Sequence, residues 1–283
     1  MEIWIILVIL YGILKGSREP IKKEILKKCN VLSTLFVYTS IGFFMSIPGS
    51  RGVLDITPGI FALILLKSSS IVVAWTLSFI AIKKVPVSVY GVTDMSRVIF
   101  STLMGVIFLH ESLTVKGIIS LILVITGLYF ANRKESVGAE EYSIKYIWIL
   151  ILSCALNGIS GTLDKYIMSL GVISSGVLQF WFMLTLSILY LFYIIIKKEK
   201  LELKKCLKNP WIYVLSLSLV FGDRLLFMAN SDPASKVTIM TLIKQSSAVV
   251  TILLGKIIYH EKHILKKILC AGIIILGIML SIL

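Results

Sequence analysis

Six charged residues interrupt stretches of the sequence that are otherwise apolar. A charge at mid-bilayer costs about 2.5–3.5 kcal/mol on insertion scales, so each one needs a partner, a water-filled cavity or a function. Four are positive and two are negative, and a cavity with this net charge of +2 favours an anionic or zwitterionic solute. The six are Lys67, Asp94, Arg97, Asp223, Arg224 and Lys244.

The most regular polar pattern follows one stretch, residues 87–109. Tyr90, Asp94, Arg97, Ser101 and Gly105 are spaced by four, three, four and four residues, which places them on one face of a helix. Asp94 and Arg97 can pair at the i, i+3 spacing, either to hold a bundle together or to contact a solute. Tyr90 is as consistent with packing as with ligand stacking.

The remaining polar residues lack such a clear local explanation. Asp223 and Arg224 can neutralise each other or find other partners. Lys67 and Lys244 have no acidic residue in the same helical turn, which favours cavity lining. Asn157 shares a helix face with Asp164, which is either part of that cavity or a solvated residue near the helix end. The predicted translocation pathway comprises Lys67, Tyr90, Asp94, Arg97, Asn157, Asp223, Arg224, Lys244 and Gln245.

Catalytic motifs are missing from the sequence. There is no H-E-x-x-H, no G-x-S-x-G and no Walker A sequence, and the four cysteines form no C-x-x-C. We therefore expect no enzyme activity, no metal site, no cofactor and no direct ATP hydrolysis.

The amino-acid composition indicates that these charges lie in membrane-spanning segments. Hydrophobic residues make up 57% of the 283 residues and charged ones 16%, with a mean hydropathy of +0.95, whereas a soluble domain has about 25% charged residues. The apolar runs are continuous, as in helices, rather than alternating as in barrel strands. We predict an all-α integral membrane protein with about ten spans, at 3–15, 31–47, 58–82, 87–109, 114–131, 145–168, 173–196, 210–229, 235–258 and 264–283.

Lysine and arginine predict the orientation, because they gather on the cytoplasmic side of membrane proteins. Of the 29, four lie on one side of the predicted spans and four lie within them, so 21 fall in or beside the loops that follow every odd-numbered span. This predicts a multi-pass protein of the plasma membrane with both termini outside the cytoplasm. It also explains the net charge of +14 by membrane topology, so we expect no nucleic-acid partner. The four on the sparse side are Arg51, Lys116, Lys165 and Lys236.

The two halves of the sequence resemble each other. The segment from Gly105 to His110-Glu111 recurs from Gly255 to His260-Glu261, at an offset of 150 residues, and Pro86-Val-Ser88 resembles Pro233-Ala-Ser235. We predict repeats at 1–131 and 145–283, joined by 132–144. Five spans in each repeat would invert the second repeat in the membrane, an arrangement common in transporters. The His-Glu pairs are interpreted as helix-end chemistry rather than metal sites.

These motifs resemble the drug/metabolite transporter superfamily, EamA type. The resemblance rests on Pro-x-Ser opening the fourth helix of each half, Gly-x-x-x-x-His-Glu ending it, and a following helix with a late glycine. Two features depart from it. The family usually has a proline early in the fourth and ninth helices, where this sequence has Met95-Ser-Arg-Val98 and Gln245-Ser-Ser-Ala248. Its termini are usually cytoplasmic.

The resemblance implies a secondary transporter, and the interior charges favour a small polar metabolite such as an amino acid, an organic anion or another zwitterion, with or without a coupling ion or proton. Two alternatives stay open. A lipid-linked carrier or flippase would open sideways to the bilayer. A non-transporting sensor or assembly protein would have a filled bundle in which every interior charge is paired. The sequence leaves the oligomeric state open.

Overall fold

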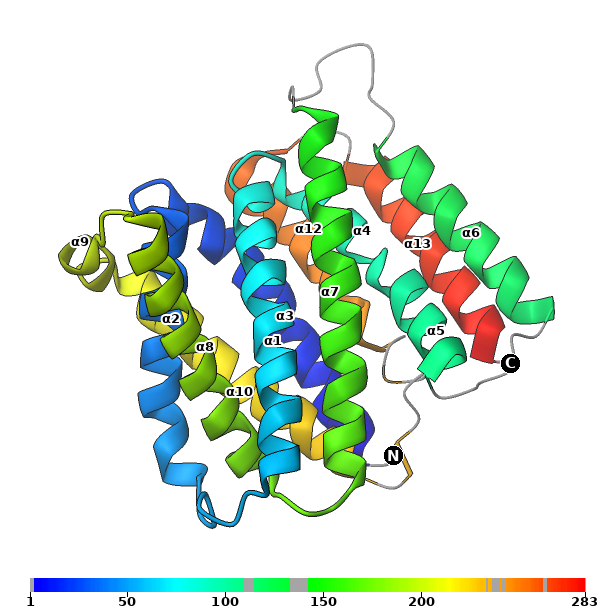
Figure 1. Cartoon of the computed structure of the whole chain (residues 1–283). Helices are drawn as coiled ribbons and strands as arrows, with labels where there is room; N and C mark the ends of the chain where they lie inside the picture. The colour runs from blue at the N-terminus through cyan, green and yellow to red at the C-terminus, as the bar shows by residue number, and fades with distance from the viewer. Residues whose placement is uncertain are drawn as a thin grey trace.

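The computed structural model describes residues 3–108, 115–132, 142–232, 234–235, 240, 243–261 and 264–282. Within these residues the protein is a bundle of helices without strands (Figure 1). The helices are α1 (Ile3–Leu26), α2 (Val31–Ser46), η1 (Ile47–Gly49), α3 (Pro58–Ile82), α4 (Val87–Asp94), α5 (Arg97–Phe108), α6 (Val115–Asn132), α7 (Ile144–Ser169), α8 (Ser175–Lys197), α9 (Leu203–Leu207), α10 (Pro210–Ser231), α12 (Ser246–Tyr259) and α13 (Ile264–Ile282).

Most helix boundaries follow the predicted ones because the sequence marks them with capping residues. Asn30, Thr57, Ser143, Ser174 and Asn209 each accept a backbone N–H of the helix that follows. The prediction of 58–82 matches α3 at both ends.

Five helical segments are long and apolar enough to cross a membrane, and large apolar side chains such as Phe192 and Ile195 are exposed on them. The five are Val31–Gly49, α3, α7, α8 and α10. This shows a helical protein with several candidate spans, while the total of ten stays a prediction. The connecting loop at 132–144 lies largely outside the described residues, as do His110, Glu111 and Pro233.

The predicted end of the first helix is wrong. We expected residues 3–15, followed by a basic loop, but α1 continues to Leu26 and buries Arg18 and Glu19. The charges do not end the helix because they have partners inside the protein: Lys15 pairs with Asp94, Arg18 with Asp223, and Lys22 with Glu19. Lys15, Arg18 and Lys22 are therefore interior residues and do not belong to a loop.

Two predicted continuous helices are interrupted. The stretch 87–109 forms α4 and α5, with a turn at Met95 and Ser96 between them. At the repeat position 150 residues later, a turn at Gln245 precedes α12. Both turns have the same tight i→i+3 bond: Val98 N–H donates to the Met95 carbonyl (3.1 Å), and Ala248 N–H to the Gln245 carbonyl (2.9 Å).

The helix contacts between the halves form a symmetric set. If α1, α2, α3, α4–α5 and α6 correspond to α7, α8, α10, α12 and α13, then the α1–α10 contact maps onto α7–α3 and the α1–α12 contact maps onto α7–α5. The contacts α2–α8, α4–α12 and α6–α13 map onto themselves. Figure 1 shows α6 and α13 side by side at one edge of the bundle and α2 with α8 at the other. This pairing is the one that the predicted repeat would produce, and the repeat itself stays a prediction.

Candidate functional site

A polar pocket lies between the two halves. Its volume is about 140 Å³, close to that of the roughly 150 Å³ engineered cavity that holds a benzene molecule. Helices α1, α2, α3, α4 and α5 contribute side chains from the first half, and α7, α8, α10 and the segment before α12 contribute them from the second. The pocket is therefore large enough for a small solute and is shared between the halves.

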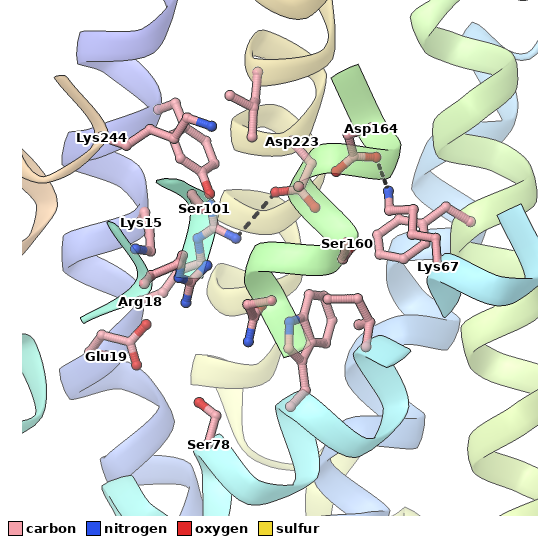
Figure 2. A pocket seen from close by; sticks show the side chains of 18 of the residues that line it. Lys15, Arg18, Glu19, Lys67, Ser78, Ser101, Ser160, Asp164, Asp223 and Lys244 are labelled. Carbon is pink, nitrogen blue, oxygen red and sulfur yellow. Dashed lines mark hydrogen bonds and ion pairs between the residues drawn. The ribbon is translucent and has the colours of Figure 1, made fainter. Parts of the chain in front are cut away.

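Charged groups from α1, α3, α5, α7, α10 and the segment before α12 face this pocket (Figure 2). Six are cationic and three are carboxylates, so the lining has an excess of positive charge. They are Lys15, Arg18, Lys22, Lys67, Arg97 and Lys244, with Glu19, Asp164 and Asp223.

Ion pairs join the lining residues to one another or to residues behind them. Lys67 contacts Asp164 on α7, and Arg18 lies 3.5 Å from Asp223 on α10. Asp94 lies between two cations, 2.6 Å from Lys15 Nζ and 2.7 Å from Arg97 Nη2. Asp94 itself lines a small adjoining hollow with Lys15 rather than the main pocket.

Lys244 has a different environment. Within the described part of the chain, no carboxylate oxygen lies within the 4.0 Å distance of an ion pair from its Nζ. Figure 2 shows Lys244 and Lys67 on opposite sides of the view, with Asp164 next to Lys67. Lys244 is thus a pocket cation without a directly bonded counter-ion.

Aromatic side chains form much of the remaining wall. Tyr38 packs on Trp75 with ring centroids 5.7 Å apart, and Trp75 meets Phe182 edge-on at 6.2 Å. Tyr90 OH bonds Ser78 Oγ at 2.6 Å. The pocket therefore has a cationic region and an apolar, aromatic one, a combination suited to a solute with a charged group and an apolar part.

Most predicted pathway residues do come together here. Those that line the pocket are Lys67, Tyr90, Arg97, Asn157, Asp223, Lys244 and Gln245. The i, i+3 pairing of Asp94 with Arg97 is confirmed. The local pairing of Asp223 with Arg224 is not found, because Asp223 pairs with Arg18 and Arg224 points away.

Arg224 lies outside the pocket. Its Nε donates to Gln179 Oε1 at 2.8 Å, and its guanidinium lies against Gly49 of η1. Residues 223 and 224 are neighbours on a helix and so point in different directions, which explains why only Asp223 reaches the pocket. Asp164 is buried against Lys67 rather than solvated.

The α1 residues Lys15, Arg18, Glu19 and Lys22 line the pocket but were not predicted to do so, because a run of charges after an apolar segment is typical of a loop. The signal for an interior position was weak. Their four-residue spacings, from Lys15 to Glu19 and from Arg18 to Lys22, fit a continued helix.

Among the described residues, no group of three or more His, Cys, Asp or Glu side chains is placed to hold a metal ion.

Glu261 has a defined structural role. The carboxylate accepts Val87 N–H at 2.6 Å and Ser88 N–H at 2.9 Å, and it also contacts Ser88 Oγ. Pro86 precedes α4 and offers no side-chain cap, so Glu261 from the second half caps a helix of the first half. The Pro-x-Ser and His-Glu motifs thus meet at one helix end, in agreement with the helix-end interpretation.

Comparison with known proteins agrees with this architecture. Residues 2–133 match the EamA-like transporter family, which confirms the resemblance drawn from the sequence motifs. A solved structure described as "Crystal structure of protein" aligns over 97% of this chain and 95% of its own, with a TM-score of 0.64 at 13% identity. At that identity the likeness supports the fold alone. No curated protein matches.

The match of residues 2–133 to the EamA-like transporter family and the apolar helices together indicate a multi-pass membrane protein whose first half resembles EamA-like transporters.

Proposed function

We propose that this protein is a secondary transporter of a small polar metabolite, either an organic anion or a zwitterion such as an amino acid. The observation that carries the proposal is Lys244, a cation that faces a pocket shared by both halves and lacks a carboxylate at ion-pair distance in the described part of the chain. A buried or half-buried charge without a partner is expensive. An anionic group of a solute would supply that partner.

The broken helices support transport rather than a static bundle. Interrupted helices at a repeat interface, near the middle of the membrane, are typical of transporter binding sites. Here the interruptions at Met95–Ser96 and at Gln245 occupy equivalent repeat positions, and Gln245 itself lines the pocket. We propose alternating access by inverted repeats at 1–131 and 145–283, in the plasma membrane, with both termini outside the cytoplasm.

The open pocket counts against a non-transporting sensor or assembly protein, which requires a filled bundle with every interior charge paired. A lipid-linked carrier remains the second candidate on the sequence alone. For a metabolite transporter and for a lipid-linked carrier alike, the transported solute would bind in the pocket. The lipid bilayer would contact the exposed apolar surface.

The experiment begins with purified protein and a thermal-stabilisation screen of amino acids, organic anions and nucleotide sugars, followed by uptake of each stabilising compound into liposomes. Lys244→Met should weaken binding of the solute about 10- to 100-fold, since a hydrogen bond to a charged group contributes about 1.5–3 kcal/mol. Lys256→Met is the matched control, because Lys256 lies on the exposed side of α12. Equal binding and uptake by the two variants would remove the proposal.

A further inference from the structure

Lys67 lies in an environment with the composition of an ammonium-binding site. Its side chain is buried, and Nζ contacts the Asp164 carboxylate. The same nitrogen lies 3.5 Å from the centroid of the Phe182 ring and 4.7 Å from that of Phe227. A carboxylate together with aromatic faces is the arrangement by which proteins recognise ammonium groups.

The Lys67–Asp164 contact is poorly satisfied for a permanent structural pair. An ammonium group carries three N–H donors, yet apart from its contact with Asp164, Lys67 Nζ makes no hydrogen bond with any described residue. Removing two charges from water is costly unless further hydrogen bonds satisfy them. A contribution to stability therefore explains this pair poorly. The pair is better explained if an ammonium group of a solute can take the place of Lys67.

We infer that Asp164, Phe182 and Phe227 form a binding site for a primary ammonium group, which Lys67 occupies when no solute is bound. All four side chains line the central pocket, so a solute in the pocket can reach the site. The ammonium group of the solute displaces the Lys67 ammonium from Asp164, and no covalent bond changes.

This inference rests on the proposed function and narrows its substrate class. Lys244 offers a partner for an oxyanion, and Asp164 offers one for an ammonium group. Both side chains line the central pocket, so one solute can reach them both. The solute class that uses both is a zwitterion with a carboxylate and a primary ammonium group, rather than a simple anion.

Chemical rescue tests the site without a transport assay. Lys67→Ala removes the internal ammonium and leaves Asp164 and the two rings in place. Adding n-butylammonium to the purified variant should raise its Tm in a concentration-dependent manner, because a ligand that binds only the folded state stabilises it. The neutral isostere n-butanol should give no such rise. The double variant Lys67→Ala/Asp164→Asn should lose this rise in Tm. The Lys244→Ala variant, in which Lys67 still occupies the site, should show no rise with butylammonium.

A second measurement uses the wild-type protein and does not require Lys67→Ala to fold. Norleucine and hexanoate share a carboxylate and a carbon chain, but only norleucine carries an ammonium group. Norleucine should bind about tenfold more tightly or better, a difference of about 1.4 kcal/mol. Asp164→Asn should remove that preference.

The outcomes separate this inference from the proposed function. The inference is overturned if butylammonium does not stabilise Lys67→Ala. If that variant cannot be purified folded, equal binding of the two acids by the wild-type protein, or binding of neither, overturns it. Binding of hexanoate that depends on Lys244 but not on Asp164 would leave an anion transporter and refute the ammonium site alone. Uptake that Lys244→Met leaves unaltered would instead refute the proposed function.

Discussion

The packing of α1 against α12 supplies a quantitative test of how this bundle is held together. Pro20 lies inside α1 and has no N–H, so the Gly16 carbonyl four residues earlier lacks its usual helical donor. Thr251 on α12 offers one, with Oγ1 3.1 Å from the Gly16 oxygen and 2.9 Å from the Ser247 carbonyl oxygen of its own helix, so the two carbonyls share its one hydroxyl proton. Gly16 permits the approach, because a Cβ there would lie 2.5 Å from the Ser247 carbonyl oxygen.

The perturbation is Thr251→Val, which keeps the shape of the side chain and removes its hydroxyl. A buried carbonyl left without a donor costs about 1–3 kcal/mol, so we expect the free energy of unfolding to fall by that amount. In a Pro20→Ala background, residue 20 regains an N–H for the Gly16 carbonyl, and the cost of Thr251→Val should drop below about 0.5 kcal/mol. The difference between the two costs is the coupling energy of a double-mutant cycle.

The measurement is reversible unfolding of the purified variants in detergent micelles, with Thr126→Val as the control. Thr126 makes the same kind of hydroxyl-to-carbonyl bond within its own helix (2.7 Å to Ile122) at an exposed site. Its replacement should change stability by less than about 0.5 kcal/mol. Equal costs of Thr251→Val with and without Pro20 would refute the reasoning, since the freed carbonyl would then have no special need of Thr251.

Three further predictions follow from other contacts and from the charge distribution. Glu261→Gln should lower the free energy of unfolding by about 2–4 kcal/mol, because it removes charge-assisted bonds to an otherwise uncapped helix; Glu199→Gln, at an exposed site, should cost under about 0.5 kcal/mol, and equal losses would contradict the capping role. Gly176→Ala should cost about 1–3 kcal/mol or more, because its Cβ would collide with the Gly49 carbonyl oxygen. Gly59→Ala, with open space around it, is the control that must stay near wild type. Reporter fusions at the C-terminus should be active only outside the cytoplasm, and activity confined to the cytoplasm would reverse the predicted orientation.

Helix positions could be predicted well where the sequence itself marks the ends. Thr57-Pro58 marks the start of α3 with a cap and a proline at the first helical position, and Asn209-Pro210 does the same for α10. The end of α1 could not be predicted, because it depends on partners far away in the sequence. Arg18, for example, is accommodated inside the bundle opposite Asp223.

The candidate site, too, could be predicted only in part from the sequence. Periodicity alone was enough to place Asp94 and Arg97 together, because the short turn between α4 and α5 keeps the two residues within ion-pair distance. The pair of Lys67 and Asp164 joins α3 to α7, and the pair of Lys15 and Asp94 joins α1 to α4. Such pairs follow from how the helices pack, which a single sequence does not specify, so the network required the structure.

The two helix interruptions could not be predicted from local helix propensity, whereas the predicted repeat relates their positions. Neither site contains a proline, so local propensity favours continuous helices through Met95 and Gln245. Tertiary contacts accompany the first turn: Lys15 pairs with Asp94, and the Cys154 thiol of α7 lies 3.8 Å from the Asp94 carbonyl oxygen. The second turn occurs at the equivalent residue with a different local sequence. If the halves are repeats, the same backbone turn with unlike side chains predicts that the position at the interface of the halves, rather than the local sequence, determines the break; Arg97 beside the first turn and Gln245 at the second both line the pocket.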